Sequence, residues 1–312
     1  MRLSLLALTL ALALGCSAGN VHFGPTGSEG AAASTGAHAG GSTSGASVNA
    51  TTAAGTGTGG AGTGGSNVGG GIHIGTGGAG GGGGTDVAEV FAQTASVLYK
   101  LDPTTKVVTT VGAFNGCNGQ VIDIALDKDG VMFGTTFGGI FKIDKATATC
   151  THIADGGYPN SLSFVPKGTV DSNVEALVGY LGATYVRMDT TTGAITQIGN
   201  LGGGYTSSGD VVSVIGGGTY LTVNGNGCGD CIVEVDPKTG ALKHLIGALG
   251  HANVYGLAFW GGAAYGFDDG GEVFQIDLTN GMSTVIPTPN SPPGLAWYGA
   301  GSTTAAPLTP PK

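Results

Sequence analysis

The chain has 312 residues, of which 64 are glycine and only 10% are charged, and its formal net charge is −9. This acidity argues against a nucleic-acid partner, which needs a basic face for its phosphates, and against electrostatic docking on anionic lipid. Glycine this abundant without a strict period indicates a low-complexity segment.

Residues 1–15 have the pattern of a targeting signal. Arg2 precedes an apolar run over residues 3–14, and a run of that length is too short to span a bilayer, which takes about 20 residues. The following Gly15-Cys16-Ser17 resembles the end of a bacterial lipoprotein signal. The resemblance implies that Cys16 is lipidated, and that the protein is exported and anchored to a membrane of the cell envelope. The alternative is an ordinary secretory signal cleaved nearby, because Ala13 and Leu14 stand in the reverse of the family's order.

Residues 16–85 consist of Gly, Ser, Thr and Ala with few other residues. Large apolar side chains are nearly absent, so no core can offset the entropy cost of ordering the backbone. We therefore expect a disordered linker, with a root-mean-square span of roughly 45 Å for a flexible Gly-rich chain of this length.

From residue 86 onward, an apolar-aromatic-x-apolar-Asp signature recurs, with successive aspartates 41 to 47 positions apart. Each copy is preceded by two strand-like runs and followed by a turn and a fourth alternating run. Four short strands per unit of this length are typical of a β-propeller blade. The five signatures end at Asp102, Asp144, Asp189, Asp236 and Asp277. Because each aspartate directly precedes a turn, and they lie a blade apart, we interpret them as turn caps rather than as a metal site.

The ends of the repeat region predict how the ring closes. The first unit, beginning at Val87-Ala88-Glu89-Val90-Phe91-Ala92, matches a second strand and lacks a first one. An unassigned run at residues 294–299 resembles the first strand at residues 256–261. We therefore predict an all-β, five-bladed β-propeller over residues 86–301, closed by the C-terminal strand Leu295 to Tyr298, which removes free sheet edges. Residues 302–312 are expected to form a flexible tail.

The repeat region resembles the bacterial propellers of the quinoprotein-like and surface-layer types. The segment Pro237-Lys238-Thr239-Gly240 after Asp236 matches their blade pattern best. The resemblance implies the architecture but no particular function, because this fold hosts enzymes, binding proteins and scaffolds.

One place where polar side chains of different blades could converge is the axis of the ring. Aligning the blades puts Asp123 and Ser161 level with Val211, Gly256 and Gly294, with Asn160 and Asp210 one step earlier. Asp123, Asn160 and Asp210 are thus candidates for an axial site, where their oxygens could hold calcium. The competing interpretation is a polar, water-filled axis.

Cys117, Cys150, Cys228 and Cys231 are the cysteines that follow Cys16, and export would place them in an oxidising compartment. We expect Cys228 and Cys231 to form a disulfide that staples a loop between the second and third strands of their blade. Cys117 and Cys150 are the remaining pair, and the sequence leaves open whether they bond to each other.

No pattern of zinc-binding histidines and no nucleophile elbow is present, so we predict neither catalytic residues nor a metal ligand set. These observations favour a membrane-anchored, non-catalytic binding or assembly module, with an unidentified protein or glycan as its ligand. The alternative is a calcium-assisted hydrolase, lactonase or lyase acting at the central channel.

Overall fold

The computed structural model of the protein describes residues 88–310. The predicted signal peptide, the predicted lipidation site Cys16 and the predicted linker 16–85 lie outside these residues. All regular secondary structure in the described part of the chain is β-strand. It contains no helix long and apolar enough to cross a membrane.

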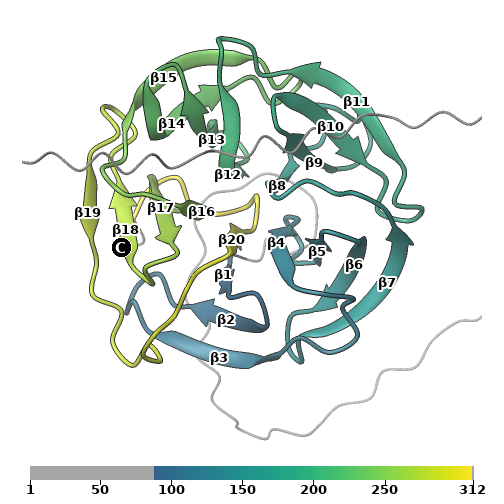
Figure 1. Cartoon of the computed structure of the whole chain (residues 1–312), viewed down its shortest axis with the longest axis vertical. Helices are drawn as coiled ribbons and strands as arrows, with labels where there is room; N and C mark the ends of the chain where they lie inside the picture. Colours follow the sequence, from purple (N-terminus) through teal and green to yellow (C-terminus); the bar gives the residue numbers. More distant parts are fainter. Residues whose placement is uncertain (1–87, 311–312) are drawn as a thin grey trace, which may run out of the picture. The chain divides into compact units, whose positions relative to one another are not determined.

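The strands form five four-stranded antiparallel sheets arranged around a common axis (Figure 1). Blade 1 contains, from the axis outward, β20 (Gly299–Ser302), β1 (Val90–Gln93), β2 (Val97–Leu101) and β3 (Val108–Ala113). Blade 2 contains β4 (Val121–Leu126), β5 (Met132–Thr136), β6 (Gly139–Asp144) and β7 (Thr149–Asp155), and blade 3 contains β8 (Leu162–Val165), β9 (Ala176–Leu181), β10 (Thr184–Met188) and β11 (Ile195–Asn200). Blade 4 contains β12 (Thr206–Ser213), β13 (Thr219–Gly225), β14 (Cys228–Val235) and β15 (Leu242–Ala248), and blade 5 contains β16 (Val254–Trp260), β17 (Ala263–Asp268), β18 (Val273–Ile276) and β19 (Ser283–Val285). The predicted five-bladed propeller is therefore confirmed.

The hydrophobic core is divided among the spaces between neighbouring blades. Five clusters of buried side chains are found, and each combines residues from two adjacent blades. Phe91 of blade 1 packs with Phe141 of blade 2, for example, and Tyr180 of blade 3 packs with Val233 of blade 4. The strands are rich in aromatic and β-branched residues because both faces of each blade are covered by its neighbours.

A C-terminal strand closes the ring, as predicted, but a later segment of the chain forms it. β20 pairs with β1 in antiparallel fashion, with Ala300 opposite Ala92, whereas the predicted strand at Leu295 to Tyr298 forms no regular structure. The reason is steric, because the axis is crowded. A Cβ atom at Gly299 would lie 2.4 Å from the side-chain nitrogen of Gln93 and 2.5 Å from Oδ1 of Asp123. Small residues therefore form this strand.

Trp297 lies two residues before β20 and is fully buried. Its ring contacts Tyr99 of blade 1 at 5.5 Å between centroids and Phe267 of blade 5 at 5.7 Å, both edge to face. Trp297 thus packs between the two blades that the closure joins. It does so from the connection before the strand.

Residues 302–306 do not belong to a flexible tail, which corrects the predicted domain boundary. Ser302 ends β20, and Thr303, Thr304 and Ala306 are buried. Thr303 forms a parallel bridge with Leu126, and the Thr304 carbonyl accepts a hydrogen bond from the backbone NH of Ile215. The segment therefore crosses the ends of the inner strands of blades 2 and 4, on the face of the ring opposite to their starts.

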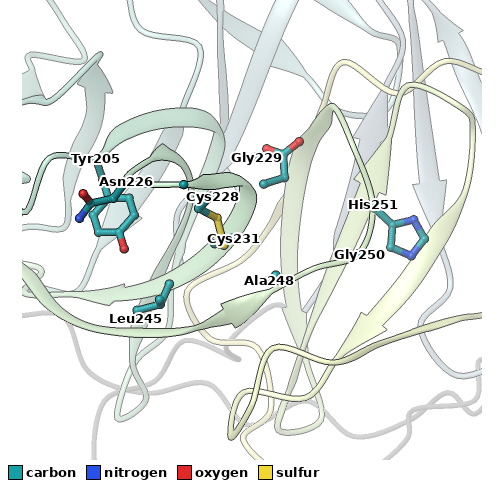
Figure 2. A pocket seen from close by; sticks show the side chains of 11 residues that line it. Tyr205, Asn226, Cys228, Gly229, Cys231, Leu245, Ala248, Gly250 and His251 are labelled. Atoms are coloured by element: carbon teal, nitrogen blue, oxygen red, sulfur yellow. A yellow bond between two sulfur atoms is a disulfide. The ribbon is translucent and has the colours of Figure 1, made fainter.

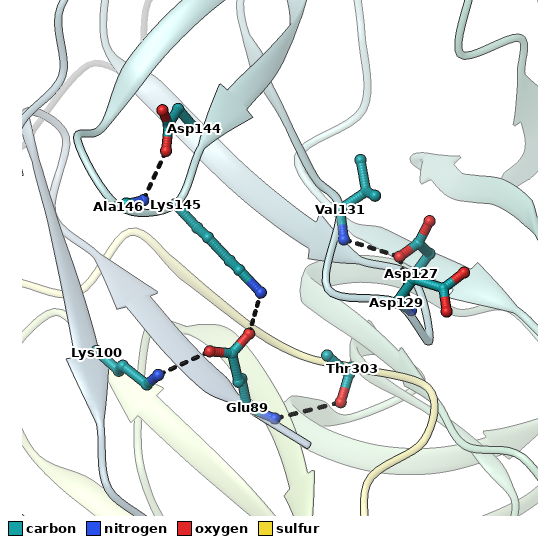
Figure 3. A network of polar contacts seen from close by, with 9 residues as sticks. All are labelled: Glu89, Lys100, Asp127, Asp129, Val131, Asp144, Lys145, Ala146 and Thr303. Carbon is teal, nitrogen blue, oxygen red and sulfur yellow. Dashed lines mark hydrogen bonds and ion pairs between the residues drawn. The ribbon is translucent and has the colours of Figure 1, made fainter. Parts of the chain in front are cut away.

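Polar contacts hold the first described residues to this segment and to blade 2 (Figure 3). The backbone NH of Glu89 donates to the hydroxyl of Thr303 at 3.3 Å, and its carboxylate pairs with Lys100 at 2.7 Å and with Lys145 of blade 2. Burial alone would raise the pKa of Glu89, but hydrogen bonds and charge from the two lysines outweigh it and leave that pKa lowered. Glu89 is therefore held as an anion between two blades.

Both pairs of cysteines form disulfides. Cys117, in the connection between blades 1 and 2, bonds to Cys150 on β7. The sequence left this pair open, and the structure explains it, because Asn115 in the same connection forms a parallel bridge with Thr149. Cys228 bonds to Cys231, as expected. Both residues lie on β14, so the bond staples the start of the third strand and does not bridge the second and third strands.

The five signature aspartates cap turns between the third and fourth strands of their blades. Asp189 Oδ1, for example, accepts hydrogen bonds from the backbone NH groups of Thr191 and Thr192 at 2.9 and 2.8 Å. Asp102, Asp144, Asp236 and Asp277 make equivalent contacts with the residues that follow them. Their interpretation as structural turn residues is confirmed.

Candidate functional site

Two of the three candidate axial residues meet at the centre of the ring. Asp123 comes from β4 and Asp210 from β12, both are fully buried, and their carboxyl groups are close enough to act on each other's pKa. The alignment of the blades is corrected here, because Asp210, rather than Val211, occupies the position equivalent to Asp123.

Each of the four carboxylate oxygens also accepts a backbone hydrogen bond. Oδ2 of Asp123 accepts from the NH of Leu162 in blade 3 at 2.6 Å, and Oδ2 of Asp210 accepts from the NH of Leu257 in blade 5 at 2.7 Å. The Oδ1 atoms accept from the NH groups of Ile124 and Val211, one residue further along each strand. The two carboxyl groups therefore join neighbouring inner strands across the blade boundaries.

Hydroxyl groups make similar links between other pairs of blades. The NH of Ser213 in blade 4 donates to the hydroxyl of Ser163 in blade 3 at 3.1 Å. The NH of Phe259 in blade 5 donates to the hydroxyl of Ser302 in blade 1 at 2.9 Å. Asp123 and Asp210 thus belong to a set of side chains that hold the ring together.

Burial raises the pKa of the Asp123 carboxyl well above its usual range, and the charge of Asp210 raises it further. Burial also raises the pKa of Asp210. Two carboxyl groups this close in a low-dielectric site do not both ionise, so the pair retains a proton at pH values where an exposed aspartate has lost it.

Asn160 does not join the buried pair. It is exposed, and it lies just before β8, one residue earlier than the position of blade 3 that is equivalent to Asp123. Calcium binding by Asp123, Asn160 and Asp210 stays a prediction that this geometry does not favour. The two carboxyl groups are buried and already accept backbone hydrogen bonds, and the third candidate ligand lies apart from them.

Asn160 instead lines a depression at the starts of the inner strands, which we call the axial mouth. Its volume is about 280 Å³. It is lined by Ile122, Phe137, Asn160, Tyr255 and Tyr298. Four blades contribute these residues, since Asn160 precedes β8, Tyr255 is the second residue of β16, Tyr298 precedes β20, and Ile122 and Phe137 belong to blade 2. Sequence reasoning missed Phe137 and Tyr298. The sequence feature that could have indicated Phe137 is an aromatic residue in the short turn between the second and third strands of blade 2.

The axial mouth is largely apolar and open. The Phe137 side chain is 75% exposed, and the rings of Tyr255 and Tyr298 lie 6.4 Å apart between centroids. Burial raises the pKa of Tyr255, and the charges of Asp269 and Asp230 raise it further, so the tyrosine hydroxyl stays protonated. The site therefore offers aromatic surfaces and an amide, and its lining contains neither a carboxylate nor a nucleophile.

A second depression, of about 420 Å³, lies at the rim of blade 4 (Figure 2). The Cys228–Cys231 disulfide lies in its wall, between Tyr205 on one side and His251 on the other. The lining combines the segment 226–229 with the side chains of Tyr205, Asp230, Leu245 and His251.

Basic side chains are distributed unevenly between the two faces of the ring. The face bearing the axial mouth is formed by the connections between blades and by the turns between second and third strands. Within the described residues, none of these segments contains a lysine or arginine. Acidic side chains are present there or at the adjoining strand ends, namely Asp155, Asp230, Asp268, Asp269 and Glu272. The turns on the opposite face carry both signs: Lys106, Lys128, Lys145, Lys167 and Lys238 lie there together with a larger number of carboxylates, among them Asp102, Asp127, Asp144, Asp171 and Asp236.

Comparisons with known proteins find structural similarity only at low sequence identity. No family model matches this chain, and no curated protein matches it. Among solved structures, TolB from Acinetobacter baumannii is similar, with 14% identity over 70% of this chain and a TM-score of 0.40. The match covers 54% of that protein. A protein of unknown function from Bacteroides caccae is similar with 11% identity over 69% of this chain and 98% of its own, with a TM-score of 0.39. The assignment of a five-bladed propeller rests on the five sheets of this chain.

Proposed function

We propose that this protein is a non-catalytic binding module whose axial mouth receives a large apolar side chain of a protein partner, next to a lysine or arginine of the same partner. One observation carries the proposal: an open aromatic depression lies at the centre of a face that has acidic side chains and, within the described residues, no basic ones.

The size of the axial mouth suits a single side chain. Pockets for small molecules occupy about 300–1,000 Å³, and the axial mouth, at about 280 Å³, lies below that range. Aromatic residues supply much of the affinity at protein interfaces when a partner's side chain covers them. Phe137 and Tyr298 are placed to contact such a side chain, and the Asn160 amide can hydrogen-bond to the partner's backbone.

The acidic surroundings add preference for a basic partner. Asp230 and Asp269 lie close enough to Tyr255 to shift its pKa, so their field reaches the axial mouth. Complementary charge at the rim of an interface mainly speeds association and excludes like-charged partners. A Lys or Arg beside the inserted side chain would therefore favour binding.

Binding is favoured over the calcium-assisted hydrolase because the lining offers no general base. The two candidate axial carboxyl groups, Asp123 and Asp210, are buried and hydrogen-bonded to the backbone. A general base must reach the proton that it abstracts.

We further propose that lipidated Cys16 and the linker 16–85 tether the propeller to a membrane of the cell envelope. The Gly15-Cys16-Ser17 motif supports the anchor. The two disulfides of the propeller fit an oxidising compartment. Replacing Cys16 with serine should move the protein from the membrane fraction to the soluble fraction, and a variant that stays with the membranes would contradict the anchor.

Selection of peptides from a random display library on the immobilised full chain tests the binding site. We expect the enriched peptides to share a large apolar residue within a few positions of a lysine or arginine. Phe137→Ser should weaken their binding about tenfold, equivalent to about 1.4 kcal/mol. Met282→Ser is the matched control, because Met282 is also exposed, at 69%, but lies in a turn on the opposite face. Peptides that bind the Phe137 variant as tightly as the wild type would contradict the proposed site.

A further inference from the structure

We propose that His251, Asp268 and Glu272 form a binding site for a divalent transition-metal ion, represented by Zn²⁺, on the face that bears the axial mouth. Nδ1 of His251 lies 3.1 Å from Oδ2 of Asp268 and 3.4 Å from Oε2 of Glu272. All three ligand atoms lie within 4.8 Å of one another.

These separations match the edges of a metal coordination shell. Zinc–nitrogen and zinc–oxygen bonds of about 2.1 Å place neighbouring ligand atoms roughly 3.0 Å apart in octahedral geometry and roughly 3.4 Å apart in tetrahedral geometry. The two distances from Nδ1 of His251 therefore need little change on metal binding. The distance between the two carboxylate oxygens can be shortened by rotation of Glu272, whose side chain is 53% exposed.

The fold holds the other two ligands in fixed positions. The His251 ring stacks on the buried Phe274 ring, with 3.8 Å between centroids and planes 7° apart. Asp268 ends β17, and its Oδ1 accepts the backbone NH of Glu272 at 2.9 Å, which leaves Oδ2 directed at the histidine. Prior orientation of ligands lowers the cost of ordering them when the ion binds.

A metal ion would also bind all three side chains of this cluster, whereas one proton on His251 cannot serve both carboxylates fully. Nδ1 of His251 carries at most one hydrogen, and two carboxylates face it. The shorter contact, to Asp268, is a hydrogen bond, whereas the contact to Glu272 is longer. Zn²⁺ would bind both carboxylates and the neutral imidazole together. The nitrogen ligand favours zinc and its transition-metal neighbours over calcium, which prefers oxygen ligands.

The surrounding charge adds to the attraction for a cation. Asp230 and Asp269 flank the loop that follows His251, because the backbone NH of Asn253 donates to Asp230 and its amide donates to Asp269. Asp268 ends β17, and Asp269 and Glu272 lie in the hairpin turn that follows it. With three protein ligands, coordination positions remain for water or for a group of a bound partner.

The test is calorimetric titration of ZnCl₂ into the full chain, after treatment with a chelator and without reductant, so that no free thiols form at Cys228 and Cys231. We expect one strong site per chain. His251→Ala and Glu272→Gln should each weaken zinc binding at least about tenfold. His152→Ala is the matched control, because His152 also contacts a carboxylate, Asp155, at 2.9 Å and a phenylalanine ring, Phe141, but has no second carboxylate among the described residues. It should bind zinc as the wild type does.

The melting temperature gives a second readout. Zinc should raise the melting temperature of the wild type and of His152→Ala, and should raise it less in the other two variants. Equal zinc affinity in the wild type, His251→Ala and Glu272→Gln would overturn the site, as would the absence of a strong site in the wild type. Tighter binding of CaCl₂ than of ZnCl₂ would overturn the assignment of the ion.

Discussion

The carboxyl groups of Asp123 and Asp210 come from blades 2 and 4 and meet at the axis of the ring, where burial raises the pKa of both. Their backbone hydrogen bonds reach blades 3 and 5. This buried pair therefore joins four of the five blades, and its proton ties the stability of the ring to pH.

The pair predicts a pH dependence of defined sign. An unfolded aspartate releases its proton near its ordinary pKa of 3.8, whereas the native pair retains one to higher pH. Between these two pKa values the native state binds more protons, so the pair makes the free energy of unfolding fall as pH rises, by at most about 1.4 kcal/mol per pH unit. Replacing both Asp123 and Asp210 with asparagine should remove this slope in urea unfolding measured between about pH 5 and pH 8, because burial raises the pKa of either carboxyl group.

The control for this measurement is Asp277→Asn. Hydrogen bonds from Thr279 lower the pKa of Asp277, so its contribution to stability is fully present above pKa 3.8 and is lost as pH falls below it. The control variant should therefore keep the wild-type slope between pH 5 and pH 8. Parallel curves for the wild type and the double variant would show that the axial pair does not retain a proton.

Truncation of the C-terminus tests the role of residues 302–309. Deleting Ser302–Lys312 removes the hydroxyl that accepts the NH of Phe259 and the buried Thr303 and Thr304. We expect this deletion to unfold or aggregate the propeller, as measured by thermal melting. Deleting only Pro310–Lys312 should leave the melting temperature nearly unchanged. Two truncations of equal stability would restore the earlier prediction of a tail that begins at residue 302.

Trp297 should be a major contributor to closure. It is fully buried between Tyr99 and Phe267, and truncation of a core tryptophan to alanine costs about 3–5 kcal/mol. Trp297→Phe should cost less, because the indole NH is buried without a hydrogen-bond partner among the described residues. Chemical denaturation of both variants measures this. A loss below about 1 kcal/mol for Trp297→Ala would contradict the packing account.

The two disulfides should contribute unequally. The Cys117–Cys150 bond spans 33 positions and the Cys228–Cys231 bond spans 3. The chain-entropy model gives roughly 4 kcal/mol for the longer loop and roughly 2 kcal/mol for the shorter one. Replacing both cysteines of each pair with alanine, followed by urea unfolding, should show the larger loss for Cys117 and Cys150. The reverse order would indicate that loop closure does not set their contributions.

The sequence predicted the number of blades because the Asp-turn signature recurs once in each. It placed the closing strand wrongly, because the run around Trp297 resembles the inner strand of blade 5, while Gly299–Ser302 has little strand propensity. Contact with Gln93 and Asp123 selects small residues there, and such a contact exists only in the assembled ring. A local pattern cannot report it.

The candidate sites were predicted less completely for the same reason. Asp123 and Asp210 were identified as axial residues, but their hydrogen bonds to other blades depend on the register between strands distant in sequence. His251 and Asp268 are 17 positions apart, so no short motif joins them. Blade geometry could have indicated the pairing, since the connection before a blade and the turn between its second and third strands lie on the same face.

The central claim is that the axial mouth binds an apolar side chain flanked by positive charge. Fluorescence anisotropy can test it with a labelled peptide that carries tryptophan between lysines, and a matched peptide that carries glutamates in place of the lysines. The account predicts that the wild-type protein binds the lysine peptide at least about tenfold more tightly, that salt weakens this preference, and that Phe137→Ser reduces the binding while Met282→Ser does not. Equal affinity for both peptides, or equal binding by the two variants, would contradict it.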